Sequence, residues 1–84
     1  MNTIDWSRKA VKQLRKITSG DQVRIYDAVQ VLAQMPDVHN VRALLNHPQG
    51  YRLRVGNYRV LFDWDGGVKI VHIEEIRKRD EHTY

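Results

Sequence analysis

The spacing of hydrophobic residues changes along the chain, from a helical period in residues 6–34 to strand-like alternation in residues 51–76. The first part predicts two helices, over about Ser7–Ile17 and Asp21–Gln34, each with an apolar stripe. The main stripe of the second helix is formed by Ile25, Val29 and Leu32. A short polar break separates them, and Pro36 ends the second because proline disfavours helical dihedral angles in the preceding residue. Two such helices need a further surface to cover their stripes.

The second part predicts that surface as an antiparallel sheet. Two alternating runs, over 51–55 and 58–64, lie on either side of Gly56-Asn57, a strong signal for a two-residue hairpin turn. A third strand is expected over about 68–73, after a second turn that contains two glycines. In the second run Tyr58 and alternate residues share one face, and the residues between them share the other.

Two further segments have weaker patterns. Residues 2–5 are a candidate edge strand, and residues 37–49 are expected to form an irregular segment that leads into the sheet. The predicted fold class is therefore α+β, with two N-terminal helices packed on one face of a three- to four-stranded antiparallel sheet. The other face is expected to be partly open. The length of 84 residues predicts one domain over 1–84.

Composition narrows the class of protein. The chain has no cysteine, which excludes a disulfide-stapled scaffold and a cysteine-based zinc module. It has no long apolar run and its first residues do not resemble a signal peptide, so we expect a cytoplasmic protein without a membrane partner. The net charge of +4 favours an anionic partner such as nucleic acid. The alternative is a basic surface that serves only solubility.

Three arginines are expected on one face of the predicted hairpin. Arg52 and Arg54 are two residues apart on one strand and point the same way, and Arg59 on the paired strand is expected near one of them. Three guanidinium groups repel one another without a counter-anion, and arginine makes planar bidentate contacts to phosphate. The set therefore indicates a phosphate-binding surface. The alternative is an ordinary polar strand face.

The C-terminal residues add a second candidate set. Arg77, Lys78 and Arg79 follow the last predicted strand, and His82 and Tyr84 add an acid–base group and an aromatic ring. An aromatic ring beside a basic surface can hold an unstacked RNA base. The alternative is a solvated tail, which this segment taken alone favours.

Other residue types give no clear site. The four histidines are widely spaced and form no helical i, i+4 pair, so no metal site is expected. Glu74 and Glu75 are expected to point to opposite faces of a strand and are interpreted as structural or surface charge. The sequence contains no phosphate-binding glycine loop, serine elbow or cysteine nucleophile. No cofactor is therefore expected.

The segment GYRLRVGNYRVLF, residues 50–62, strongly resembles the central hairpin of the RelE/ParE toxin superfamily. Residues 6–10 and 77–84 fit the start of the first helix and the C-terminal motif of that family, so the resemblance covers nearly the whole chain. It implies a toxin of a type II toxin–antitoxin system with a RelE-like fold. Its implied partners are a cognate antitoxin, the 70S ribosome and mRNA.

The resemblance to the RelE-like branch also implies a reaction. RelE-like members are endoribonucleases that cut mRNA in the ribosomal A site, with the 2′-OH of the mRNA as nucleophile and without a metal. By resemblance Arg59 contacts the scissile phosphate and Tyr84 stacks on or orients the base. The C-terminal catalytic arginine maps to Arg77 or Arg79, and Arg79 is the choice made here. Four further cations are expected to bind RNA: Lys12, Lys16, Arg77 and Lys78.

The chain departs from the family at the positions that supply a general base. Arg52 and Arg54 stand where known RelE-like members carry lysine, and arginine does not lose its proton in proteins. The base is therefore left open between His82, which titrates near neutral pH, and Tyr84. Two other functions remain as alternatives: a ParE-like inhibitor of DNA gyrase, and a non-catalytic relative that only binds an antitoxin.

Overall fold

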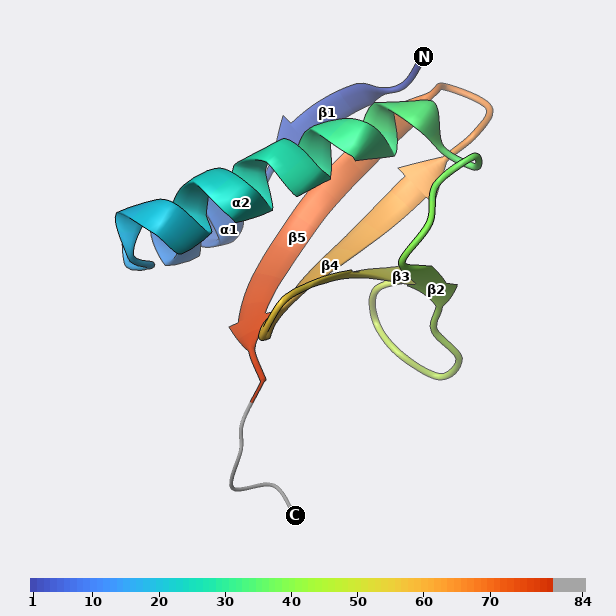
Figure 1. The fold of residues 1–84 in the computed structure, drawn as a ribbon. Helices are drawn as coiled ribbons and strands as arrows, with labels where there is room; N and C mark the ends of the chain where they lie inside the picture. Colours follow the sequence, from blue (N-terminus) through green and yellow to red (C-terminus); the bar gives the residue numbers. More distant parts are fainter. Residues whose placement is uncertain (80–84) are drawn as a thin grey trace.

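The computed structural model describes residues 1–79, so residues 80–84, with the predicted His82 and Tyr84, lie outside the described part. Its elements lie in the chain order β1–α1–α2–η1–β2–β3–β4–β5 (Figure 1). The strands are β1 (Thr3–Trp6), β2 (Val41–Ala43), β3 (Tyr51–Val55), β4 (Tyr58–Asp65) and β5 (Ile70–Lys78). The helices are α1 (Arg8–Arg15), α2 (Ser19–Gln30) and the 3-10 helix η1 (Val31–Gln34). Figure 1 shows α1 and α2 together on one side of the sheet.

The five strands form a mixed sheet in the order β1-β5-β4-β3-β2. The α+β class and the two helices on the sheet are confirmed, and the candidate edge strand is present as β1. The expected antiparallel pairing is wrong at this edge, because β1 pairs parallel with β5. Strand β5 lies between β1 and β4. It runs antiparallel to β4 and in the same direction as β1.

A fifth strand, β2, was not expected. It lies in the segment predicted to be irregular and pairs antiparallel with β3, with Val41 opposite Leu53 and Ala43 opposite Tyr51. Three residues are too few for alternation to be recognised, and two of the three are exposed. The strand therefore forms because β3 offers it a hydrogen-bonding edge, and its own sequence pattern carries little signal.

The helix ends differ from the predicted ends by a few residues. The side chain of Ser7 caps α1, with its Oγ accepting a hydrogen bond from the N–H of Ala10 at 3.0 Å. The predicted second helix divides into the α-helix α2 and the tighter turn η1, which ends at Gln34, before Pro36. Its predicted end is therefore right, and its last turn is a 3-10 turn.

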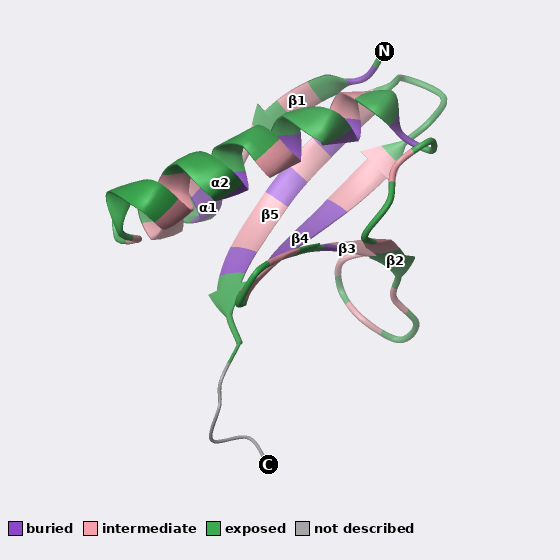
Figure 2. Cartoon of the chain, in the orientation of Figure 1, coloured by how far each residue is buried: buried purple, intermediate pink, exposed green. Residues whose placement is uncertain are grey.

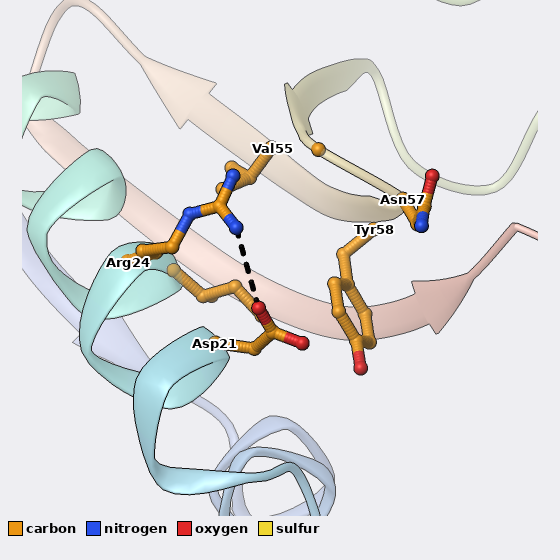
Figure 3. A pocket seen from close by; sticks show the side chains of 7 residues that line it. Asp21, Arg24, Val55, Asn57 and Tyr58 are labelled. Atoms are coloured by element: carbon orange, nitrogen blue, oxygen red, sulfur yellow. Dashed lines mark hydrogen bonds and ion pairs between the residues drawn. The ribbon is translucent and has the colours of Figure 1, made fainter.

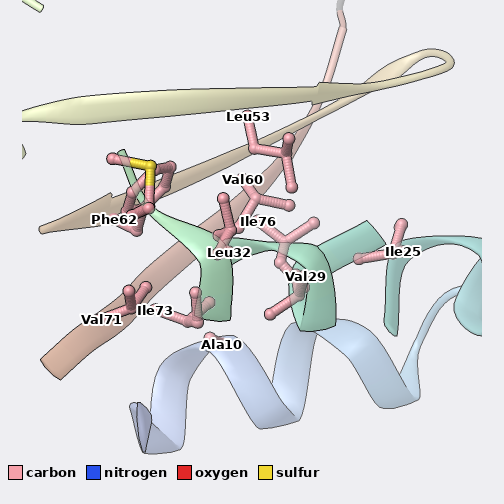
Figure 4. Packing of buried hydrophobic residues seen from close by; sticks show 11 residues of the cluster. Ala10, Ile25, Val29, Leu32, Leu53, Val60, Phe62, Val71, Ile73 and Ile76 are labelled. Atoms are coloured by element: carbon pink, nitrogen blue, oxygen red, sulfur yellow. The ribbon is translucent and has the colours of Figure 1, made fainter. Parts of the chain in front are cut away.

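The core lies between the helices and the sheet, and Figure 4 shows its side chains converging from both layers. Figure 2 shows buried residues along the central strands β4 and β5. Burial of one large apolar side chain stabilises the fold by roughly 1.5–3 kcal/mol, so this cluster provides most of the driving force. Its largest fully buried members are Phe62, Ile25, Leu32, Ile73, Val29, Val60 and Val71.

A β-bulge in the pairing of β4 with β5 sets which residues face the helices. Leu61 lies opposite Glu75 and Phe62 lies opposite Ile73, so Glu74 is the additional residue. Strict alternation from Ile73 would turn Ile76 away from the core. The bulge resets the alternation, which buries Ile76 and places Glu75 on the face opposite the helices.

Helix α1 continues along β5 where β1 ends. The Ser7 hydroxyl donates to the carbonyl oxygen of Glu74 at 2.8 Å, and the N–H of Ile76 donates to Oε1 of Gln13 at 2.7 Å. These side chains satisfy backbone groups of β5 that β1 does not reach. The helix therefore lies along the edge of β5, beyond the end of β1.

Candidate nucleic-acid interface

A row of three arginines crosses the sheet on the face opposite the helices. Arg59 of β4 lies directly opposite Arg54 of β3 on one side and Arg77 of β5 on the other. The prediction that Arg59 neighbours one of the two hairpin arginines is confirmed. Directly opposed side chains in adjacent strands have Cβ atoms about 5 Å apart, so this row concentrates positive charge.

A second row lies next to the first. This row runs across four strands in the order β2, β3, β4 and β5. Its members are Arg42, Arg52, Leu61 and Glu75, and each lies directly opposite the next. We call the five arginines of these two rows the arginine face: Arg42, Arg52, Arg54, Arg59 and Arg77. Arg42 was not predicted from the sequence, because the three-residue strand that carries it is too short to show alternation.

Arg52 lies in the centre of the arginine face. Burial lowers the pKa of its guanidinium, and the charges of Arg59, Arg42 and Arg54 lower it further. Its Nε is buried and has no hydrogen-bond partner within residues 1–79. Neighbouring Leu61 is only 4% exposed although it points away from the helices, as expected when long arginine stems cover it. An anion here would relieve the repulsion among the guanidinium groups.

Glu75 brings a carboxylate onto this face, which the sequence interpretation missed. Its Oε1 lies 3.2 Å from Nζ of Lys9 and 3.2 Å from Nε of Arg77. Burial alone would raise the pKa of Glu75, but hydrogen bonds from Arg77 and Lys9 outweigh it and leave the pKa below its usual value. The bulge at Glu74, which places Glu75 here, has no signature in the sequence.

The other end of the same sheet face is acidic. His72 of β5 lies opposite both Asp63 of β4 and Asp5 of β1. Its Nδ1 is 3.1 Å from Oδ2 of Asp5, and Oδ1 of Asp63 accepts the N–H of Gly50 at 2.7 Å. A phosphate is attracted to the arginine end of this face and repelled by these carboxylates.

The remaining predicted cations lie elsewhere. Lys78 is opposite Tyr58, so it belongs to the helix side, where it lines a groove of about 340 Å³ together with Lys16. Lys12 is exposed on α1. Arg79 is exposed just beyond the end of β5, and its N–H donates to the carbonyl oxygen of Asn57 at 2.6 Å.

A smaller cavity, of about 130 Å³, lies between α2 and the β3–β4 turn (Figure 3). Asp21 and Arg24 form an ion pair at its wall, with Nη1 and Oδ1 3.4 Å apart. Gly56 in the turn has φ +55°, and Nη2 of Arg24 lies 3.2 Å from the position a Cβ would take, so a larger residue is disfavoured. This cavity faces away from the arginine face.

Metal sites and membrane-spanning helices are two other features that could point to a function. Residues 1–79 contain no group of three or more histidine, cysteine, aspartate or glutamate side chains that could hold a metal ion. In the same residues no helix has the length and apolar character needed to cross a membrane. The arginine face is the candidate functional site because it gathers five guanidinium groups around the Nε of Arg52, which is buried and unpartnered in the part of the chain that the structure describes.

The family is decided by comparison with known proteins. The sequence model of the ParE toxin, described as the toxin of the type II toxin–antitoxin system parDE, matches residues 4–83. The chain belongs to this family. It is thus a type II toxin of the RelE/ParE superfamily, and the resemblance seen in the sequence is confirmed. A comparison with curated proteins gives no match.

Solved structures of RelE toxins share the fold of this toxin. The isolated RelE toxin of E. coli superposes with a TM-score of 0.81 at 16% identity, covering 99% of this chain and 89% of that chain. A chain of the RelBE2 toxin–antitoxin complex of Mycobacterium tuberculosis gives 0.81 at 21% identity, covering 93% and 98%. A chain of the archaeal RelE–RelB complex of Pyrococcus horikoshii OT3 gives 0.79 at 21% identity, covering 95% and 97%.

Proposed function

We propose that this toxin is a ribosome-dependent endoribonuclease that cuts mRNA in the A site. The observation that carries the proposal is the cross-strand row of Arg54, Arg59 and Arg77 on the open face of the sheet. Three guanidinium groups that the strands hold in register can together contact the phosphate oxygens of an RNA backbone.

The proposed reaction breaks one phosphodiester bond. The 2′-oxygen of the mRNA attacks the adjacent phosphorus, the bond from phosphorus to the 5′-oxygen breaks, and the products are a 2′,3′-cyclic phosphate and a 5′-hydroxyl end. Negative charge builds up on the non-bridging oxygens in the transition state. Arg59, in the middle of the row, is the residue we assign to stabilise that charge, with Arg54 and Arg77 on either side of it and Arg52 in the next row. Arg79, just beyond the end of β5, is a further cation that we assign to the catalytic set.

The proton transfers need groups other than the arginines. One group takes the proton of the 2′-OH, and another gives a proton to the leaving 5′-oxygen. Arg52 stays protonated at neutral pH even though burial and its three arginine neighbours lower its pKa. We assign proton transfer to His82 and Tyr84, which lie beyond the described residues.

The proposal includes partners. Several relatives with this fold were solved as RelB–RelE complexes, and we propose that this toxin also binds a cognate antitoxin, one with acidic segments that complement its positive charge. The ribosome and its mRNA are the proposed targets, in the cytoplasm. The exposed cations Lys12, Lys16 and Lys78 are available for RNA outside the scissile site.

A purified translation system tests this function. The toxin is added to ribosomes that translate a defined mRNA, and primer extension maps any new 5′ ends. We expect cuts within the A-site codon with the wild-type protein and the Arg24→Ala control, which removes an arginine on the helix side. Arg59→Ala should cut far less. Intact mRNA at saturating wild-type toxin would contradict the proposal.

A second function, inhibition of DNA gyrase, is favoured by one specific observation. The family model that matches residues 4–83 is that of the ParE toxin. Under this alternative the arginine face binds a protein or DNA and no RNA is cut. A supercoiling assay with purified gyrase separates the two: inhibition there, together with unaffected translation, would support the gyrase function and exclude the ribonuclease.

A further inference from the structure

Glu75 is a carboxylate placed inside a surface that otherwise collects positive charge. Its side chain is 14% exposed, whereas its two partners are well exposed, Lys9 at 64% and Arg77 at 59%. A carboxylate at this place repels the phosphate that the arginines attract. Its presence therefore needs a physical explanation beyond charge balance.

The atoms in contact suggest the explanation. Both cations meet the same oxygen, Oε1 of Glu75, at 3.2 Å. The ion-pair contact of Arg77 is made by Nε, the nitrogen next to its aliphatic stem. A guanidinium held at Nε loses freedom about its stem while its bidentate fork remains available to an anion.

The backbone builds this contact from two separate elements. Glu75 and Arg77 are two residues apart on β5 and share a side, and the bulge at Glu74 turns both of them to the face opposite the helices. Helix α1 lies along the edge of β5 and carries Lys9 to the rim of the arginine face. A carboxylate that served only solubility would need neither the bulge at Glu74 nor the placement of α1 along β5.

We propose that Glu75 is a positioning residue of the RNA-binding surface: its carboxylate orients Arg77 through Nε and draws Lys9 of α1 into the phosphate-binding set. This inference rests on the proposed function, since it concerns how the arginine face binds an RNA phosphate. The low pKa of Glu75 fits the role, because the carboxylate stays ionised wherever RNA is bound near neutral pH.

For the removal of the Glu75 charge, a positioning role and simple charge counting predict opposite changes in RNA affinity. Removal of a negative charge from a cationic surface should tighten the binding of RNA. If Glu75 orients Arg77, its removal instead weakens binding, because a freely rotating arginine must be ordered when the phosphate binds. The direction of the effect separates a positioning residue from a bystander.

The experiment measures binding of a short single-stranded RNA with 2′-O-methyl sugars, which cannot be cleaved by 2′-OH attack, at one fixed low salt concentration. Glu75→Gln removes the charge with little change of shape, and we expect binding roughly threefold to fivefold weaker, the upper range for one exposed ion pair. Glu75→Asp keeps the charge and should bind more tightly than Glu75→Gln. Glu74→Gln is the matched control, because Glu74 forms no ion pair within residues 1–79. Equal effects at the two positions, or tighter binding by Glu75→Gln, would overturn the proposal.

A second measurement does not depend on RNA. The Nε–H signal of Arg77 in a ¹⁵N NMR spectrum should be protected from exchange with water in the wild-type protein and in Glu74→Gln, and should lose that protection in Glu75→Gln. If the wild-type protein binds no RNA while this signal behaves as expected, the proposed function fails and the orienting contact stands. If the signal is unprotected in the wild-type protein, the positioning role fails whatever the RNA assay shows.

Discussion

Leu61 and Phe62 are neighbours on β4, and both are almost completely buried, but their side chains lie on opposite faces of the sheet. Phe62 faces the helices, is 0% exposed and stacks on Tyr51, with ring centroids 5.5 Å apart. Leu61 faces the other way and is 4% exposed between Arg52 and Glu75. The core face is closed by fixed secondary structure, and the open face by long charged side chains that can move away. The core face therefore contributes stability, and the open face can exchange its cover for a ligand.

The largest expected effect is on the core face. Phe62→Ala removes a fully buried ring and should lower the free energy of unfolding by about 3–5 kcal/mol, because the helices above it cannot collapse into the space. Leu61→Ala is its matched control on the open face. We expect a loss near 2 kcal/mol there, since the arginine stems can close over the smaller residue. Chemical denaturation with both variants measures the difference, and equal losses would show that the two faces are equally rigid.

The next effect is on activity. Arg59→Ala should reduce the rate of mRNA cleavage by about 10²–10³-fold, or roughly 3–4 kcal/mol of transition-state stabilisation, because it removes the central group of the arginine row. Its unfolding free energy should change little or rise, since repulsion from Arg54 and Arg77 is relieved. Single-turnover cleavage and denaturation on the same preparation check both statements. A strong loss of stability without a loss of cleavage would reverse the assigned roles of the two faces.

The sequence predicts the core face much better than the open face. Periodicity finds Ile25, Val29 and Leu32 on the helix and Val60 and Phe62 on the strand, because burial imposes a period on apolar residues. It also finds that Arg59 neighbours one of the two hairpin arginines, and the structure shows that this neighbour is Arg54.

The parts of the site that the sequence missed depend on long-range pairing. Arg42 reaches the face on a strand that forms only because β3 offers an edge, and Glu75 reaches it through a bulge. Arg77 was predicted to follow the last strand, but it lies within β5, and its place opposite Arg59 follows from the same bulge. No local sequence pattern predicts the positions of these residues, because they depend on which strands pair and in which register.

A smaller effect on stability is expected at Ser7, the N-cap residue of α1. Ser7 caps α1 and also donates a hydrogen bond to the carbonyl oxygen of Glu74, so it fixes both the helix and the bulge. Ser7→Ala should cost about 1 kcal/mol of unfolding free energy, with an upper range near 2. Thermal unfolding followed by circular dichroism measures it. Thr18→Ala is the control, because Thr18 precedes α2 without a side-chain hydrogen bond to its backbone, and a similar loss there would argue against a special role of Ser7.

The smallest expected effect on stability is the pH-dependent contribution of Glu75 to the unfolding free energy. The folded protein holds the pKa of Glu75 below its usual value, because hydrogen bonds from Arg77 and Lys9 outweigh the opposing effect of burial. A carboxyl group of this kind stabilises the folded state above the usual carboxyl range, and the contribution is lost as the pH falls through the lower folded value. The difference in stability between the wild-type protein and Glu75→Gln should therefore be present near neutral pH, at no more than about 1 kcal/mol since both cations are exposed, and should shrink in acid. Denaturation over a series of pH values tests this, and a difference that grows in acid would show that the sign is wrong.

The last prediction separates the arginines of the open face from one another by salt dependence. Arg54 is exposed at the end of the row, whereas Arg59 beside it is half-buried. Arg54→Ala should weaken the binding of single-stranded RNA modestly and reduce the slope of log affinity against log salt by about 0.7, the value for one phosphate contact on a single strand. Arg24→Ala, on the helix side, should leave the slope unchanged. Equal changes in slope for both variants would mean that the net charge of the protein controls RNA binding, and that the placement of arginines on one face does not.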